Sequence, residues 1–163
     1  MSDVIVLAAG KSSRHGKSNK LLTEIHNKPL IFHTVNEIIN SKAKKVIIVT
    51  GRDHKEICNI LKGFNVDIIH NQNYETGISS SISSGVEHLP KNSSSTMICL
   101  ADMPLLASND YNDIIDFHQQ NGGVSRIGAP FRKKTLGNPI PWTYSEFLSL
   151  QIDSVEGPWV ISI

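Results

Sequence analysis

Short apolar runs alternate with helix-compatible segments along most of this 163-residue chain. The runs are Val4 to Ala8, Val46 to Thr50, Val66 to His70 and Met97 to Ala101. Because parallel strands must be joined by long crossover connections, usually helices, this alternation predicts an α/β fold with a mostly parallel sheet. With 39% apolar residues, the chain can build one core, and we expect a single domain over residues 1–163.

Four segments between and after these runs are expected to be helical. The first begins near Pro29, a favoured first-turn residue, and the second covers Lys55 to Leu61. The Ser-rich stretch TGISSSISSGVEHL has the composition of a linker, but its apolar residues recur four, four and three positions apart, which indicates a helix. A fourth helix is expected from about Ser108, whose hydroxyl can cap it.

The pattern weakens beyond Gly123. VSRIGAPF and NPIPWTY are typical of short extended pieces, and FLSL of a short helix. The last seven residues, GPWVISI, fit neither a clean helix nor a strand with polar alternation, so we make no structural prediction for them.

Composition narrows the class of protein. The formal charge of +1 argues against the broad basic field of a nucleic-acid-binding protein. There is no apolar run long enough to cross a bilayer and no signal-peptide pattern, so we expect a cytoplasmic protein without a membrane partner. Cys58 and Cys99 lie within apolar patterns and form no C-x-x-C motif, which favours reduced core thiols.

A cationic loop follows the first apolar run, in the segment VIVLAAGKSSRHGKSNK. Gly10 and Gly16 allow backbone N–H groups to turn around an anion, and basic side chains supply positive charge. The basic side chains are Lys11, Arg14, Lys17 and Lys20. This make-up predicts a phosphate-binding loop.

Two common kinds of phosphate loop fit this segment poorly. The Walker pattern has four residues between its glycines, whereas five lie between Gly10 and Gly16. A P-loop also opens a long helix, but Pro29 follows only eleven residues after Ser18. A dinucleotide loop fits even less well, because G-x-G-x-x-G is absent and the second run closes at Thr50 without an acidic residue.

The loop instead has the form L-A-A-G-x-S-x-R-x-G-x-x-N-K-L-L, from Leu7 to Leu22. Three further segments follow in order: YETGISSSISSG, LADMPLL and LGNPIPW. With these motifs the chain resembles the MobA-like nucleotidyltransferases, and most closely the molybdenum cofactor cytidylyltransferases, from residue 4 to about residue 153.

The resemblance implies a three-layer α/β/α, Rossmann-like fold of the nucleotide-diphospho-sugar transferase type. It also implies a Mg²⁺-dependent transferase that moves CMP from CTP to a phosphorylated acceptor and releases pyrophosphate. The expected acceptor is the molybdopterin form of the molybdenum cofactor.

Such a reaction brings together several anions, so fixed cations and a divalent metal are the groups it needs. We assign Lys20 and Arg14 to the phosphates, in agreement with the resemblance. Asp102 ends an apolar run at the edge where α/β sheets bind ligands, and its carboxylate suits Mg²⁺. The resemblance adds Asp153 as a second metal ligand, although Ile152 stands where the family has glycine.

The resemblance places the base against the first loop and associates Ala at position 9 with cytidine and Gly there with guanosine. This favours CTP over GTP, while Ser79 to Ser81 offer hydroxyls to the nucleotide or the acceptor. Lys11 and Lys17 fit solvent-facing positions equally well. The predicted nucleotide-binding residues are Leu7, Ala8, Ala9, Gly10, Lys11, Ser12, Arg14, Lys20, Ser79, Ser80 and Ser81.

Two other functions remain open on the sequence. A transferase of the same fold can use a sugar or polyol phosphate as acceptor. Alternatively, the departure at Ile152-Asp153 and the unusual carboxyl end are compatible with a shortened, catalytically weak relative. Such a protein would bind the cofactor and deliver it to an apo-molybdoenzyme or its chaperone.

Overall fold

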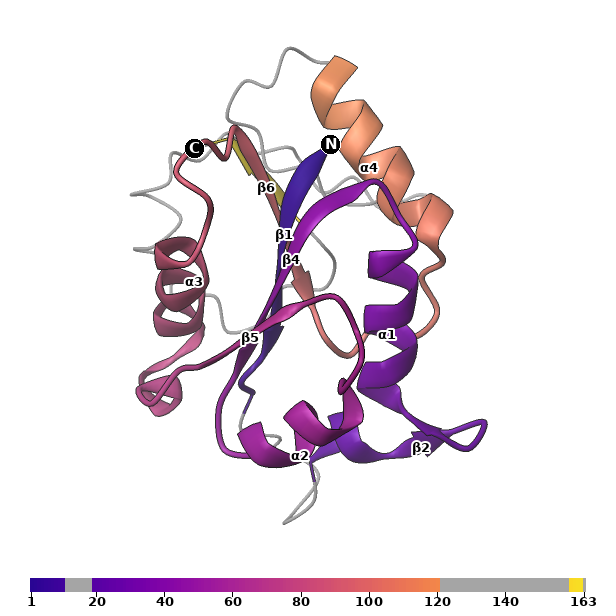
Figure 1. Ribbon diagram of the computed structural model, residues 1–163, viewed down its shortest axis with the longest axis vertical. Coiled ribbons are helices and arrows are strands. Elements are labelled where there is room, and N and C mark those ends of the chain that lie inside the picture. The colour runs from indigo at the N-terminus through magenta and orange to yellow at the C-terminus, as the bar shows by residue number, and fades with distance from the viewer. Residues whose placement is uncertain (11–18, 121–158, 163) are drawn as a thin grey trace, which may run out of the picture.

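The computed structural model describes residues 1–10, 19–120 and 159–162, and within them its central element is a five-stranded sheet (Figure 1). The strand order is β5-β4-β1-β6-β7, in which β7 is antiparallel to β6 and the other neighbours are parallel. The strands are β1 (Ser2–Ala8), β4 (Ala43–Thr50), β5 (Asp67–His70), β6 (Ser95–Leu100) and β7 (Trp159–Ser162). The predicted mostly parallel sheet is confirmed.

Strand β1 lies at the centre of the sheet and is buried along its whole length. A parallel strand covered on both faces is expected to be apolar throughout rather than alternating, which explains the run VIVLA. Its register places Val4 beside Val46 of β4 and beside Met97 of β6. The four apolar runs of the sequence therefore became the four parallel strands.

Helices cover both faces of the sheet. Side chains of α1 (Leu30–Ile39), α2 (His54–Ile60) and α4 (Ser108–Gln120) pack with every second residue of β1 in one apolar cluster. Side chains of α3 (Ile78–Glu87) pack in a second cluster with the intervening residues of the sheet. Figure 1 shows α3 on one side of the sheet and α1 and α4 on the other. This is the predicted three-layer α/β/α arrangement.

The Ser-rich stretch is helix α3, as its apolar spacing predicted. The helix packs closely against β1 at Gly85, where an added Cβ would lie 2.6 Å from Cγ2 of Ile5. A side chain at this position would push the helix away from the strand. The glycine is therefore a packing requirement of the helix–sheet contact.

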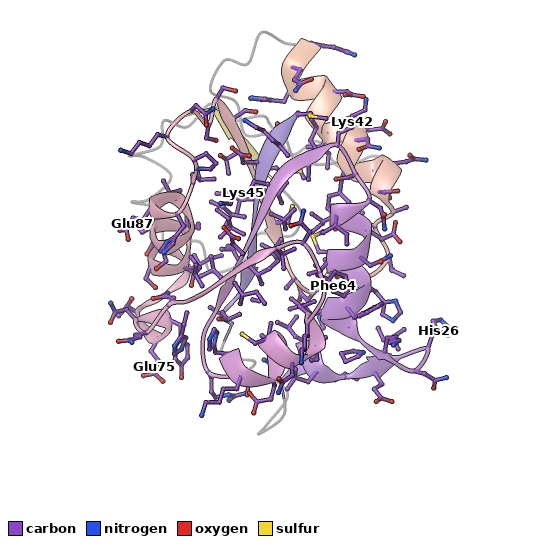
Figure 2. All side chains as sticks on the ribbon, in the orientation of Figure 1. His26, Lys42, Lys45, Phe64, Glu75 and Glu87 are labelled. Carbon is purple, nitrogen blue, oxygen red and sulfur yellow. The ribbon has the colours of Figure 1, made fainter. Side chains whose placement is uncertain are left out.

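A hairpin and an edge strand, besides the 3₁₀ turns η2 (Lys20–Leu22) and η3 (Tyr74–Thr76), were not predicted from the sequence. A short hairpin of β2 (Glu24–Ile25) and β3 (Lys28–Pro29) precedes α1 and extends away from the sheet, with His26 at its tip (Figure 2). Its two turn residues, His26 and Asn27, have φ of 48° and 63°, the left-handed conformation that a tight type I′ turn requires. The other element is β7, whose segment WVIS lacks the polar alternation by which an edge strand is usually recognised.

The amino terminus of α4 differs in detail from the prediction. Ser108 is the first helical residue, so it follows the capping position instead of occupying it. The Asp110 carboxylate accepts a hydrogen bond from the Ala107 N–H group at 2.8 Å, and Glu37 accepts one from the Ser108 N–H group at 2.9 Å. Carboxylates thus accept from the N–H groups of Ala107 and Ser108 at this helix end. No helix within the described ranges combines the length and apolarity needed to cross a bilayer.

Candidate functional site

The four parallel strands end at the same edge of the sheet, and the polar residues of interest follow those ends. Two backbone hydrogen bonds continue the ladder beyond the strands: Ala101 N–H donates to Leu7 O at 3.0 Å, and Asn71 N–H donates to Thr50 O at 2.9 Å. The residues that leave the sheet are thereby held near one another. Ligands of open α/β folds bind at this carboxyl edge.

Lys20 and Asp102, to which we assigned a phosphate and a metal ion, lie together at this edge of the sheet. Lys20 begins the single 3₁₀ turn η2 (Lys20–Leu22), and its Nζ donates to Asp102 Oδ2 at 3.1 Å. The two side chains are 44% and 37% exposed. An ion pair this exposed contributes only about 0–1 kcal/mol, so a ligand can exchange for either partner at little cost.

The end of β1 lies at the bottom of this site. Leu7, Ala8 and Ala9 are buried, whereas Gly10 is exposed, so the chain leaves the core between Ala9 and Gly10. An added Cβ on Gly10 would meet no atom of the described residues within 4 Å. Leu7 and Ala8 pack in the two apolar clusters on opposite faces of the sheet, and the chain reaches solvent at Gly10. Contact of Leu7, Ala8 and Ala9 with a base stays a prediction.

Asn19 was not predicted, yet it is one of the most buried polar residues of this edge, at 4% exposure. Its Oδ1 accepts a hydrogen bond from Leu21 N–H at 3.0 Å and so caps the turn that begins with Lys20. Its Nδ2 donates to Asp53 Oδ2 at 2.7 Å, in the loop after β4. The N-K-L-L part of the motif contained this residue, but its role depends on the folded contact with Asp53.

Ser79, Ser80 and Ser81 lie in the first turn of α3, and two of them hold the preceding loop. Asn71 Nδ2 donates to Ser80 Oγ at 2.9 Å and to Ser81 Oγ at 3.1 Å. Ser80 Oγ also lies within hydrogen-bond distance of Asn73 O and Gly77 O, and Ser81 is 4% exposed. These two hydroxyls have structural partners, and Ser79 is half-buried. Contact of the three serines with a nucleotide stays a prediction.

Four predicted site residues lie outside the described residues. These are Lys11, Ser12, Arg14 and Asp153. Their assignments to the nucleotide and to the metal stay predictions.

The described part of the chain nevertheless tests the P-loop alternative. A P-loop continues into a long helix, but here the loop is followed by the three-residue turn η2 and then by the β2–β3 hairpin. This observation agrees with the glycine spacing, and both argue against a Walker-type site.

The chemistry of Asp102 fits Mg²⁺. This ion prefers oxygen ligands and is typically held by one or two carboxylates, with substrate phosphates and water completing its coordination. Asp102 offers a partly exposed carboxylate at the edge where the phosphates are expected. Among the described residues, no three His, Cys, Asp or Glu side chains are placed to hold a metal ion together.

Both cysteines are free thiols, but of the two predicted core residues only Cys99 lies in the core. Cys99 is fully buried in the core beneath the site, and this burial raises the pKa of its thiol well above the usual range. Cys58 is half-buried on α2, with Sγ 3.6 Å from Nε2 of His54.

Comparison with known proteins identifies the family. The model of the MobA-like NTP transferase domain matches residues 4–157, which is nearly the whole chain. The chain belongs to the MobA-like NTP transferase family. The family resemblance noted in the motifs is therefore confirmed, and a nucleoside triphosphate substrate is consistent with it.

Curated relatives of this MobA-like domain include a probable molybdenum cofactor guanylyltransferase from Thermococcus sibiricus. It is 30% identical over 158 residues, which are 93% of this chain and 75% of that protein. The bifunctional protein GlmU of Staphylococcus epidermidis is 25% identical over 116 residues. That alignment covers 71% of this chain but only 25% of GlmU.

Solved structures confirm the nucleotide-diphospho-sugar transferase type of fold. A nucleotidyl transferase from Methanothermobacter thermautotroptrophicus superposes with a TM-score of 0.64 at 23% identity, over 71% of this chain and 57% of that chain. The 4-diphosphocytidyl-2C-methyl-D-erythritol synthase of Anaerococcus prevotii gives a TM-score of 0.69 at 16% identity, over 99% of this chain and 71% of that chain.

Proposed function

We propose that the chain transfers CMP from CTP to a phosphorylated acceptor, with the molybdopterin form of the molybdenum cofactor as the acceptor. A phosphate oxygen of the acceptor attacks the α-phosphorus of CTP. The bond from that phosphorus to the bridging oxygen breaks, and pyrophosphate leaves with the electron pair. The observation that carries the proposal is the meeting of Lys20 and Asp102 beside the end of β1, within a MobA-like domain.

In this proposal the side chains position the reactants and balance their charge. Lys20 is a point charge for the α-phosphate, and Arg14 is assigned to the remaining triphosphate oxygens. Asp102, with Asp153 as the expected second ligand, would hold Mg²⁺. When bound, that ion would neutralise charge on the triphosphate and the departing pyrophosphate. No covalent intermediate with the protein is required.

The choice of nucleotide rests on Ala9. This residue is buried at the end of β1, where the resemblance associates alanine with cytidine and glycine with guanosine. The name of the Thermococcus sibiricus relative refers to guanylyl transfer instead. CTP and GTP must therefore be compared directly on this chain.

Calorimetric titration of the purified chain with CTP, GTP and ATP, each with Mg²⁺, tests this proposal. We expect CTP to bind most tightly, Asp102→Asn to weaken binding, and Ala9→Gly to shift the preference toward GTP. Stronger binding of GTP by the wild-type chain would refute the cytidylyl assignment. Pyrophosphate release with molybdopterin, sugar phosphates and polyol phosphates then tests the acceptor, and release only with a sugar or polyol phosphate would refute molybdopterin. Binding of CTP without release in any mixture would refute the transferase activity and favour a delivery protein.

A further inference from the structure

Asp53 occupies the capping position of α2 but does not use its side chain as a cap. Asp is a preferred capping residue because its carboxylate can accept hydrogen bonds from the first free N–H groups of a helix. In this chain the Asp53 side chain makes no capping hydrogen bond to α2. Only its backbone takes part, as Asp53 O accepts from Ile57 N–H at 3.1 Å. The carboxylate is therefore used elsewhere.

The Asp53 carboxylate turns toward the segment that carries Lys20. Its Oδ2 accepts from Asn19 Nδ2 at 2.7 Å and from Arg52 Nε at 3.2 Å, and its side chain is only 20% exposed. This links the loop after β4 to the residue directly before Lys20. The contact joins two segments that are distant in sequence but end at the same edge of the sheet.

The link fixes the orientation of the Asn19 amide. A carboxylate accepts hydrogen bonds but cannot donate them, so it holds the NH₂ end of the amide and turns the carbonyl end toward Leu21 N–H. Asn19 is nearly fully buried, and without Asp53 its Nδ2 would lose the charged acceptor that holds it there. Asp53 therefore helps to hold the amide in the orientation that makes the capping bond of η2.

We propose that Asp53 is a positioning residue for Lys20, acting through Asn19. The inference rests on the proposed function, in which the Lys20 ammonium serves the α-phosphate. The Lys20 side chain extends from its backbone over a limited length, so a shift of that backbone shifts the region that the ammonium can reach. Asp53 holds that backbone by fixing the turn that begins at Lys20.

A ligand-free measurement tests the structural half of this inference. Amide hydrogen exchange of Leu21 reports on its bond to Asn19 Oδ1, and Asp53→Ala is expected to accelerate it about tenfold. Asp53→Asn keeps an acceptor oxygen and should leave the rate near the wild-type value. Asp67→Ala is a control, because it removes a carboxylate that pairs with Lys45 at 2.7 Å on β4. An unchanged Leu21 rate in Asp53→Ala would overturn the inference.

The functional half is tested by steady-state transfer from CTP in the presence of Mg²⁺. Displacing a catalytic group by about 1 Å can cost up to about a hundredfold in rate, so we expect Asp53→Ala to lower kcat tenfold or more. The acceptor KM should stay unchanged, and Asp53→Asn should restore most of kcat. In a Lys20→Met background, Asp53→Ala should have no further effect, because both changes remove the same interaction.

If the losses in kcat caused by Asp53→Ala and Lys20→Met multiplied in the double variant, this would contradict action through Lys20. If the wild-type chain neither binds nor turns over CTP, the proposed function has failed. Leu21 exchange still decides then whether Asp53 fixes the turn.

Discussion

Replacing Lys20 by methionine is expected to change metal binding and nucleotide binding in opposite directions. The Lys20 ammonium lies 3.1 Å from Asp102 Oδ2, on the carboxylate that we assign to Mg²⁺. A metal ion that arrives alone must displace this ammonium and then bind beside it. A triphosphate, in contrast, gains a cation from Lys20. Methionine keeps most of the side-chain length and removes only the charge.

The size of both effects can be worked out from the pair. Two unit charges about 4 Å apart interact with about 1 kcal/mol in water, so a divalent ion beside Lys20 is repelled by about 2 kcal/mol. Because the side chain is 44% exposed and can move away, we expect the affinity of Asp102 for a divalent ion alone to rise about tenfold in Lys20→Met. A charged hydrogen bond contributes about 1.5–3 kcal/mol, so CTP affinity should fall about tenfold or more.

Mn²⁺ can serve as the probe for the metal, since its free concentration is read by electron paramagnetic resonance without nucleotide. CTP affinity is then measured by calorimetry at fixed Mg²⁺. Lys42→Met is a matched control, because Lys42 pairs with Asp116 on α4 at similar exposure, far from the sheet's carboxyl edge (Figure 2). This control should change neither affinity.

This reasoning would be refuted if the Lys20→Met variant bound the metal ion more weakly than the wild-type chain, or if it bound CTP with the wild-type affinity. An equally large loss of CTP affinity in Lys42→Met would also refute it, because it would show a general effect of charge.

Removal of the metal with a chelator should lower CTP affinity in the wild-type chain and change it much less in Asp102→Asn.

Three further predictions concern the scaffold. The Tyr111 hydroxyl is fully buried and is without a hydrogen-bond partner in the described part of the chain, so Tyr111→Phe should raise the free energy of unfolding by about 1 kcal/mol in urea denaturation; a clear loss would reveal a partner. Gly85→Ala should lower that free energy by about 1–3 kcal/mol because its Cβ would clash with Ile5, whereas Ser83→Ala on the same helix should not. Burial lowers the pKa of His118, so the unfolded chain takes up a proton at this residue before the folded chain does, and stability should be lost as the pH falls below about 6.5. The melting temperature should therefore depend less on pH in His118→Gln than in the wild-type chain, and an equal dependence would contradict this prediction.

The apolar pattern was sufficient to predict the parallel strands and the helices between them, because it records burial directly, whereas the three-layer arrangement followed from the family resemblance. Strand β1 is apolar throughout since both of its faces are covered, and α3 shows helical spacing despite its many serines. The position of Asp102 at the carboxyl edge of the sheet was also predictable, because it follows an apolar run, whereas its ion pair with Lys20 was not predicted.

Other features depend on contacts that no local pattern records. Asp53 follows a strand like many loop acids, and only the folded chain shows its carboxylate turned from α2 toward Asn19. The hydrogen bonds that Ser80 and Ser81 accept from the Asn71 amide, after the end of β5, were likewise not visible in the sequence. Strand β7 was missed because its segment shows no polar alternation.

The central claim is that this sheet edge transfers a cytidylyl group. The most direct test supplies CTP labelled at the α-phosphate, with Mg²⁺ and molybdopterin, and follows the label into the acceptor. We predict that the label appears in the acceptor with equimolar pyrophosphate, and that Asp102→Asn abolishes its transfer. A parallel reaction uses GTP with the same label. Transfer of the label from GTP but not from CTP would contradict the cytidylyl assignment, and transfer from neither nucleotide would contradict the assignment to molybdopterin.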